Sequence, residues 1–257
     1  MTDARDPIAA GHYARQQIHS GNPLIRWSHG RRLRSGLVLA RPFCGGRVLD
    51  YGCGDGTFLG LLHASDAPPA LGVGAEIDPR IVIDCQRRFA IFPRLRFVDV
   101  TALERAEESG SYDAVFCLEV LEHVIDARPL LADFERLLRP GGTLVISVPI
   151  EIGLPVLVKQ LVRRMAGWRR IGDYPGTTGY NPRELARSVL AASRPHLARP
   201  VFQRADGHLF HDHKGFNWRV LRATVASRFD LVRTVTSPFN WPGPHLSTQV
   251  WFVARRR

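Results

Sequence analysis

Residues 48–58 read Val-Leu-Asp-Tyr-Gly-Cys-Gly-Asp-Gly-Thr-Phe, a short apolar stretch followed at once by three alternating glycines. The apolar part is typical of a buried strand of a parallel sheet, and the residues after Gly56 have the apolar spacing of a helix. Glycine permits positive φ and lets a ligand approach the bare backbone. The stretch therefore predicts a strand, a ligand-binding turn and a helix.

Two carboxylates distinguish this turn from a dinucleotide-binding turn. The chain has Gly-x-Gly-x-Gly rather than Gly-x-Gly-x-x-Gly, with Asp50 ahead of the first glycine and Asp55 inside the turn. These acids would repel a diphosphate, whereas a ligand with an ammonium and a sulfonium would be favoured. The stretch closely resembles motif I of class I S-adenosylmethionine (SAM) methyltransferases. An ordinary glycine-rich turn is the alternative.

Length and composition fit one globular α/β domain with extensions, since the chain has 257 residues of which 45% are hydrophobic. We find no secretory signal and no apolar run that could cross a bilayer, so we expect a cytoplasmic protein. The four cysteines form no Cys-x-x-Cys pair and are expected to be reduced, buried thiols. They are Cys44, Cys53, Cys85 and Cys117.

The chain is strongly basic, with a formal charge of +11, and Lys159 and Lys214 are its only lysines. Arginine binds planar oxyanions well, although a GC-rich genome explains the arginine content equally simply. The charge makes an anionic acceptor, a nucleic acid or an acidic membrane surface more plausible partners.

Strands and helices alternate from Arg47 onward, which favours a Rossmann-like, doubly wound α/β fold with a mostly parallel sheet. Helices are expected at 8–20, 27–40, from Pro79, and at 126–138. Five strands are expected near 46–51, 71–77, 95–100, 112–118 and 143–148, and two at 229–237 and 248–254 complete the seven that the resemblance implies. The predicted parts are an N-terminal helical lid (1–44), a SAM-binding core (45–150), a helical insertion or acceptor lid (151–206) and a C-terminal part of the core (207–257).

Acidic residues lie at the ends of three successive predicted strands: Asp50, Glu76 and Asp99. Ligands of open α/β sheets bind at the carboxyl ends of strands. Glu76 is placed to accept both ribose hydroxyls and Asp99 to accept from the adenine amino group. The resemblance implies that Asp50 helps to hold the methionine ammonium. The full set of expected cofactor-binding residues is Asp50, Gly52, Cys53, Gly54, Glu76, Ile77, Asp99, Val100, Leu118 and Glu119.

The end of the fourth strand runs into Glu-Val-Leu-Glu-His at 119–123. If this segment is helical, Glu119, Glu122 and His123 share one face, and their mutual repulsion would be relieved by a divalent cation such as Mg²⁺ or Mn²⁺. The Glu-x-x-Glu-His pattern resembles that of metal-dependent O-methyltransferases, both the small-RNA 3′-end 2′-O-methyltransferases and the ubiquinone-pathway enzymes. In the alternative, Glu122 and His123 only cap a helix or line a pocket.

A second element, Asp212-His213-Lys214, resembles the distal Asp-His-Lys-Phe-Glu-Trp of the small-RNA enzymes, with Gly215 inserted before Phe-Asn-Trp. The resemblance implies His213 as the fourth metal ligand, with His211 as the alternative because of the insertion. Such a metal lowers the pKa of an attacking hydroxyl, and a neutral His211 or His213 can act as the base.

The insertion after the fifth strand has apolar residues at helical spacing with lysine and arginine off that stripe, which predicts a basic amphipathic helix over 154–170. Such a helix either covers an acceptor pocket or makes peripheral contact with a membrane. Asn181 and Glu184 predict a capping box at the start of another helix.

Together these features predict a SAM-dependent methyltransferase that methylates an oxygen of a hydroxylated small molecule, sugar or lipid-linked glycan. Two alternatives stay open. One is an RNA 2′-O-methyltransferase, against which the sequence shows no appended RNA-binding module. The other is a SAM-binding partner protein that has lost catalysis. No Ser/His/Asp arrangement, P-loop or haem motif is present.

Overall fold

The computed structural model describes residues 6–157, 159–160, 179–191, 197–204, 207–239 and 243–257. Most of the amphipathic helix expected over 154–170 lies outside these ranges. Its described part, 154–157 and 159–160, is helical.

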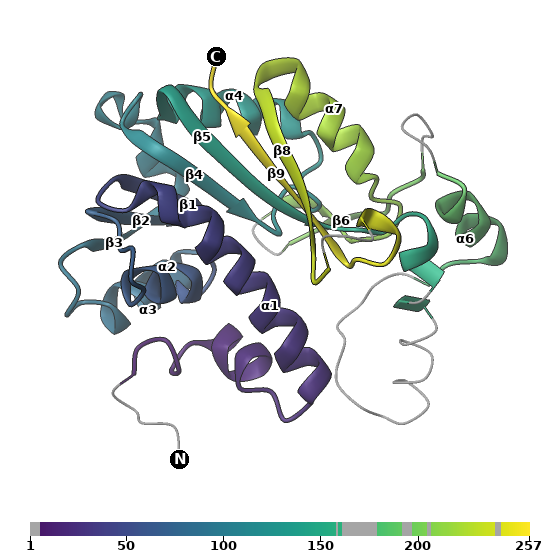
Figure 1. The fold of residues 1–257 in the computed structure, drawn as a ribbon, viewed down its shortest axis with the longest axis horizontal. Helices are drawn as coiled ribbons and strands as arrows, with labels where there is room; N and C mark the ends of the chain where they lie inside the picture. Colours follow the sequence, from purple (N-terminus) through teal and green to yellow (C-terminus); the bar gives the residue numbers. More distant parts are fainter. Residues whose placement is uncertain (1–5, 158, 161–178, 192–196, 205–206, 240–242) are drawn as a thin grey trace. The chain divides into compact units, whose positions relative to one another are not determined.

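A single sheet of seven strands confirms the predicted fold class (Figure 1). Its spatial order is β3-β2-β1-β4-β5-β9-β8, with β1 parallel to both β2 and β4, and β2 parallel to β3. The order reverses beside β1, where β2 lies on one side and β4 on the other, and this is where open α/β sheets bind ligands. The strands are β1 (Arg47–Tyr51), β2 (Leu71–Glu76), β3 (Leu95–Asp99), β4 (Tyr112–Leu118), β5 (Leu138–Pro149), β8 (Asp230–Ser237) and β9 (Gln249–Arg255).

The predicted boundaries fail in three places. β5 begins at Leu138, directly after helix α4 (Ala127–Leu137), whereas the fifth strand was expected near 143–148. Helix α1 begins at Pro23 rather than at residue 27, and proline suits a first helical position because its missing N–H has no partner there in any case. The helix expected at 8–20 is represented by a short π-helix, Ala14–Ile18.

Contacts divide the chain into two compact units. The first comprises residues 1–118, 132–146 and 253–257, and the second comprises 119–131 and 147–252. The four-part division made from the sequence stays a prediction. The longer helices are α1 (Pro23–Ala40), α2 (Thr57–His63), α3 (Pro79–Arg88), α4 (Ala127–Leu137), α6 (Pro182–Val189) and α7 (Trp218–Arg228). Short 3-10 helices are Arg41–Phe43, Val100–Glu104, Ala106–Glu108 and Gly243–His245.

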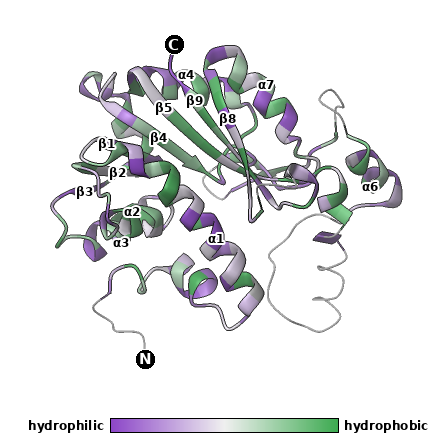
Figure 2. Ribbon diagram, viewed as in Figure 1, coloured by the Kyte–Doolittle hydropathy of each residue, from purple (hydrophilic) through white to green (hydrophobic). Residues whose placement is uncertain are grey.

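In the first unit, α2 and α3 contact β2, and α3 also contacts β3. Leu49, Val73 and Val115 are fully buried, as apolar central strands require, and apolar colouring follows β4 and β5 in Figure 2. Three cysteines are buried as expected, but Cys44 is exposed; all four are free thiols. No helix in the described ranges is both long enough and apolar enough to cross a membrane.

In the second unit, α6 begins with the predicted capping box, in which Asn181 and Glu184 each accept a backbone N–H of the other. A short antiparallel pair, β6 (Val201–Gln203) and β7 (Leu209–His211), precedes α7. α7 contacts β8.

A buried carboxylate joins several segments of the first unit. Glu108 accepts hydrogen bonds from Arg47 (2.6 Å), Arg96 (2.5 Å) and the Tyr112 hydroxyl (2.6 Å). Burial opposes ionisation of Glu108, but the hydrogen bonds from Tyr112 and Arg96, with the charges of both arginines, hold its pKa below the ordinary value. Glu108 therefore ties the starts of β1 and β4 to β3.

We expect Glu108→Gln to lower the free energy of unfolding by about 2 kcal/mol at neutral pH, because it leaves partly buried arginines without their counter-ion. A depressed carboxyl pKa stabilises the fold above the unfolded-state pKa, and this contribution is lost as pH falls through the folded-state value. In denaturant unfolding at several pH values, the free energies of unfolding of wild type and Glu108→Gln should therefore become equal in acid. Asp66→Asn is the control, since its pair with Arg41 is 62% and 73% exposed and contributes less than about 1 kcal/mol. Equal effects of the two substitutions would contradict this account.

Candidate functional site

The turn after β1 is built by glycines at positive φ: Gly52 (71°), Gly54 (51°) and Gly56 (75°). A Cβ added to Gly56 would lie 2.9 Å from the rings of Phe89 and Phe97, so this glycine is required by packing. A Cβ added to Gly54 would meet no heavy atom within 4 Å. The backbone of Gly54 therefore borders open space, as the turn of a ligand site requires.

The three strand-end acids lie on adjacent strands of the first unit. Glu76 and Asp99 are direct partners in the β2–β3 register, and Asp50 lies on β1 beside β2. Asp50 is 2% exposed. Burial, and secondarily the charge of Glu76, raises its pKa to about 8. A positively charged group would offset both effects, so this end of the sheet favours a cation.

Glu76 also shapes the turn. Its Oε2 accepts the Gly54 N–H at 3.0 Å, and its Oε1 accepts the N–H groups of Ile77 (2.8 Å) and Asp78 (3.3 Å). A carboxylate oxygen can accept two hydrogen bonds, so these contacts leave Oε2 of Glu76 able to accept one more, from a ligand hydroxyl. The carboxylate would thus fix both the turn and its ligand.

Asp99 caps the 3-10 helix that begins at Val100. Its Oδ1 accepts from the backbone N–H (2.9 Å) and the hydroxyl (2.7 Å) of Thr101, and these bonds lower its pKa. An ionised carboxylate is an acceptor only, which suits an amino group.

Asp55 has a role that the sequence reasoning missed. Its Oδ2 accepts the Tyr13 N–H at 2.7 Å, and a Cβ on Gly11 would come within 2.4 Å of the same oxygen. Arg88 adds hydrogen bonds to the carbonyls of Pro7 and Asp55, both at 2.6 Å. The N-terminal segment is therefore fastened to the glycine turn.

In the second unit, the segment after β4 is a turn, so the helical face that would align Glu119 with Glu122 and His123 does not form. Glu119 has φ of 58°, its N–H donates to the Ser147 carbonyl, and its Oε1 accepts the Ser147 hydroxyl at 2.9 Å. Positive φ is costly for glutamate and is concentrated at functional sites.

Glu122, His123 and His213 come together as a possible metal site, with one ligand atom from each lying within 4.8 Å of the others. Glu122 is fully buried, and its Oε1 lies 3.9 Å from His123 Nε2. His123 Nδ1 lies 2.8 Å from the His211 carbonyl, which can only accept, so Nδ1 carries the proton. In this tautomer Nε2 has the lone pair that a metal needs. Glu119, the other predicted ligand, is not part of this group.

Glu151 is a further acid near this cluster, and the sequence reasoning did not identify it. It is 1% exposed, and its Oε1 lies 4.0 Å from His213 Nδ1 and 2.7 Å from Lys159 Nζ. Burial lowers the pKa of His213 despite the opposing charge of Glu151, which favours a neutral ring. The available signal was an acidic residue just beyond the apolar strand β5.

Arg199 joins the two sequence elements that supply the cluster. Its Nη2 donates to the carbonyls of Glu122 and Asp212. Burial lowers the pKa of Arg199 to about 10, so the guanidinium stays charged at neutral pH. Arg199 and Lys159 therefore supply positive charge beside the carboxylates of this region.

The inserted Gly215 has a steric explanation. It has φ of 73°, and a Cβ there would lie 2.6 Å from the Ala198 carbonyl oxygen. Lys214, one residue earlier, pairs with Glu184 at 2.9 Å and donates to the Gly179 carbonyl at 2.8 Å. The Asp-His-Lys element is thus held by α6, and His213 reaches the cluster.

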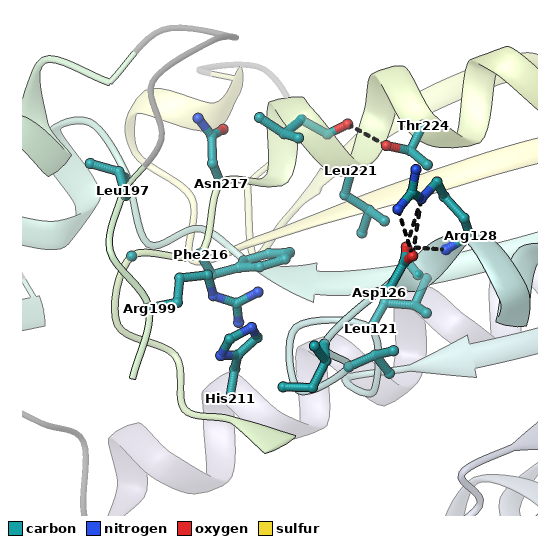
Figure 3. A pocket seen from close by; sticks show the side chains of 15 residues that line it. Leu121, Asp126, Arg128, Leu197, Arg199, His211, Phe216, Asn217, Leu221 and Thr224 are labelled. Atoms are coloured by element: carbon teal, nitrogen blue, oxygen red, sulfur yellow. Dashed lines mark hydrogen bonds and ion pairs between the residues drawn. The ribbon is translucent and has the colours of Figure 1, made fainter. Parts of the chain in front are cut away.

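A cavity of about 620 Å³ lies within the second unit (Figure 3). Its walls come from Leu121, residues 124–128, Leu197, Arg199, His211, residues 215–217 and the first turns of α7. His211 and Arg199 both line it, whereas His213 does not.

The raised pKa of Asp50 predicts a specific pH dependence of stability. The folded protein holds this proton more tightly than the unfolded chain, so the contribution is complete below the ordinary aspartate pKa and is lost as pH rises through about 8. In thermal unfolding of the ligand-free protein, the free energy of unfolding of Asp50→Asn should rise relative to that of wild type between about pH 5 and about pH 8. The rise should be at most about 1.4 kcal/mol per pH unit. Asp99→Asn is the control with the opposite sign, because the pKa of Asp99 is lowered. Parallel curves for wild type and Asp50→Asn would contradict the raised pKa.

Comparison with known proteins agrees with this architecture. The chain is 33% identical over 159 residues to a ubiquinone biosynthesis O-methyltransferase of Xanthomonas oryzae pv. oryzae, covering 58% of this chain and 60% of that protein. It is 35% identical over 155 residues to an uncharacterized 37.1 kDa protein in transposon TN4556 of Streptomyces fradiae, covering 60% and 44%. The chain thus spans about half the length of these curated relatives.

Solved structures share the fold. A protein from Pyrococcus horikoshii OT3 aligns with a TM-score of 0.60 at 14% identity, covering 95% of this chain and 98% of that one. A putative SAM-dependent methyltransferase from Listeria monocytogenes aligns with a TM-score of 0.54 at 16% identity, covering 88% and 98%. Residues 26–192, more than half of the chain, match the family described as "Methyltransferase domain". The chain belongs to this methyltransferase domain family.

Proposed function

We propose that this protein is a SAM-dependent methyltransferase that methylates an oxygen of a hydroxylated small molecule, sugar or lipid-linked glycan. The observation that carries the proposal is the set of acids Asp50, Glu76 and Asp99 on three adjacent strands, beside a turn whose Gly54 borders open space. The Xanthomonas relative is named as an O-methyltransferase, which supports oxygen as the methylated atom.

The residues of the first unit fit the cofactor. When bound, SAM supplies a methyl group on a positively charged sulfur, open to attack by a nucleophile. Asp50 would hold the ammonium group, Glu76 the ribose hydroxyls and Asp99 the adenine amino group. Ionisation of Asp50, which burial disfavours in the free protein, would be favoured by that ammonium.

The second unit fits a divalent cation through Glu122, His123 and His213. One buried carboxylate and two imidazoles suit Mn²⁺ better than a thiolate-preferring ion, and the hydrogen bond to the His211 carbonyl presents His123 Nε2 as a ligand. A cation there would lower the pKa of an acceptor hydroxyl. His211 Nδ1 faces the Pro200 carbonyl at 2.8 Å, so its Nε2 is the acceptor and can receive a proton. His211 or His213 would serve as the base.

The cofactor assignment is tested at Gly54. Gly54→Ala adds a Cβ to open space, so we expect a loss of about 1 kcal/mol in folding stability from its φ of 51°, but at least about a tenfold loss of S-adenosylhomocysteine affinity in calorimetry. Gly110→Ala is the matched control, since Gly110 has φ of 63° and equally open surroundings.

Equal S-adenosylhomocysteine affinity in wild type and both variants would show that the glycine turn is not part of the cofactor site. Once S-adenosylhomocysteine binding has been shown, the acceptor class is identified by testing transfer of labelled methyl from SAM to a panel of phenols, sugars and small RNAs. Label appearing only in RNA would favour the RNA alternative. Transfer to no acceptor would favour a non-catalytic SAM-binding protein.

The metal assignment is tested by Mn²⁺ calorimetry. We expect Glu122→Gln and His213→Asn each to weaken Mn²⁺ binding at least about tenfold, because each removes a ligand from the cluster. Glu119→Gln, whose carboxylate bonds Ser147 instead, should change the affinity little. An equal loss in Glu119→Gln would restore the four-ligand set expected from the sequence. No Mn²⁺ binding in wild type would leave a metal-free enzyme with a histidine base.

A further inference from the structure

We propose that the cavity of the second unit binds the methyl acceptor, and that this acceptor is a phenol or an enol: an apolar body carrying a neutral but acidic hydroxyl. The inference rests on the proposed function and narrows its substrate class. Three features of the cavity carry it: the chemistry of its walls, one acceptor atom, and one donor atom.

The walls are mostly hydrocarbon. Leu121, Val124 and Ile125 contribute from the segment after β4, Phe216 from the loop before α7, and Leu221 from α7 itself. The volume of about 620 Å³ falls within the range of roughly 300–1,000 Å³ that small-molecule pockets occupy. The cavity therefore suits a carbon skeleton the size of one or two rings rather than a highly hydroxylated sugar.

His211 supplies an acceptor for a hydroxyl group. Its Nδ1 lies 2.8 Å from the Pro200 carbonyl, which cannot donate, so the ring proton is on Nδ1 and Nε2 has the lone pair. The backbone N–H of His211 donates to the His123 carbonyl, which fixes the strand that carries the ring. An acceptor O–H can donate to Nε2 without rearrangement of the site.

Arg199 supplies the donor for the oxygen. Its Nη2 is occupied by the carbonyls of Glu122 and Asp212, but its Nε–H is buried and finds no hydrogen-bond partner within the part of the chain that the structure describes. The guanidinium lies 5.2 Å from the centre of the Phe216 ring. Figure 3 shows Arg199 and His211 pointing toward one another at one end of the cavity. An oxygen between them would accept from Arg199 and donate to His211.

The charges around the cavity favour a ligand whose hydroxyl is neutral but acidic. The carboxylates of Glu122 and Asp212 act on Arg199, and Asp126 at the rim is paired with Arg128 at 2.8 Å. Among the described residues that line the cavity, each cation therefore has a carboxylate nearby, which disfavours a ligand that is already anionic. An aliphatic alcohol is too weak an acid for one guanidinium to ionise at neutral pH. A phenol or enol enters neutral, and beside Arg199 its anion is stabilised while the hydroxyl proton leaves along its hydrogen bond to His211 and passes on to solvent.

The test uses 4-nitrophenol, whose ionised form is yellow, with the full-length protein. Saturating protein should lower the pKa of the bound probe by about one unit, which is a tenfold change in its ionisation constant. Arg199→Met should abolish this shift. Arg128→Met, which removes a paired rim arginine of the same cavity, should leave most of it. A residue with only a structural role would not change the probe's pKa.

A second variant guards against a folding defect in Arg199→Met. Val220 lines the cavity and is 43% exposed, so Val220→Phe can fill the space while every bond of Arg199 is kept. We expect it to weaken 4-nitrophenol binding at least about fivefold, with Val232→Phe on exposed β8 as the size-matched control.

Three results would overturn the proposal. One is 4-nitroanisole, which lacks the hydroxyl, binding as tightly as 4-nitrophenol. Another is 4-nitrobenzoate binding more tightly, since the cavity would then be an anion site. The third is a probe pKa that is unchanged by the protein. Titration with S-adenosylhomocysteine in parallel distinguishes failure of this proposal from failure of the proposed function. If S-adenosylhomocysteine binds but the probe is not ionised, only the acceptor class is refuted. If the probe is ionised but S-adenosylhomocysteine does not bind, only the proposed function is refuted.

Discussion

A carboxylate withheld from water, Asp50, is the constraint on which the first unit's site depends. Its burial and the neighbouring charge of Glu76 raise its pKa to about 8, so the free protein bears the cost of two acids at one sheet edge. Such a cost persists when a ligand relieves it or a network compensates for it. Glu108 in the same unit shows compensation, since two arginines and a tyrosine lower its pKa. For Asp50 the proposed function supplies the relief through the ammonium group of the bound cofactor.

In the second unit, positively charged side chains lie beside the buried carboxylates. From the sequence, crowding of carboxylates and imidazoles argued for a metal, on the assumption that nothing else could supply positive charge. The structure supplies some of it through Arg199 beside Glu122 and Lys159 beside Glu151. Charge balance alone therefore no longer argues for a metal. The argument now depends on ligand geometry, namely three converging ligand atoms and a His123 ring whose tautomer is set by the His211 carbonyl.

The sheet and the three strand-end acids could be predicted because both depend on local patterns: apolar strands, glycine at the turn, and an acid where each strand ends. The misses have a common cause. Asp55 bonds Tyr13 across 42 positions of the chain, and Arg199 bonds Glu122 across 77. No periodicity marks such partners. Glu119 is a separate, local case: a turn with φ of 58° forms where a helix was assumed, so Glu119 does not share a helical face with Glu122 and His123.

The inserted Gly215 shows how a local departure from a pattern can preserve a site. A residue added between Lys214 and Phe216 would be expected to rotate the histidines out of register. Instead the chain turns at positive φ against Ala198, where only glycine fits, and His213 still meets His123 with ring centres 4.9 Å apart. His211 remains paired with His123 through its backbone N–H and its carbonyl. The two histidines consequently lie in different places: His213 belongs to the cluster of possible metal ligands, and His211 lines the cavity.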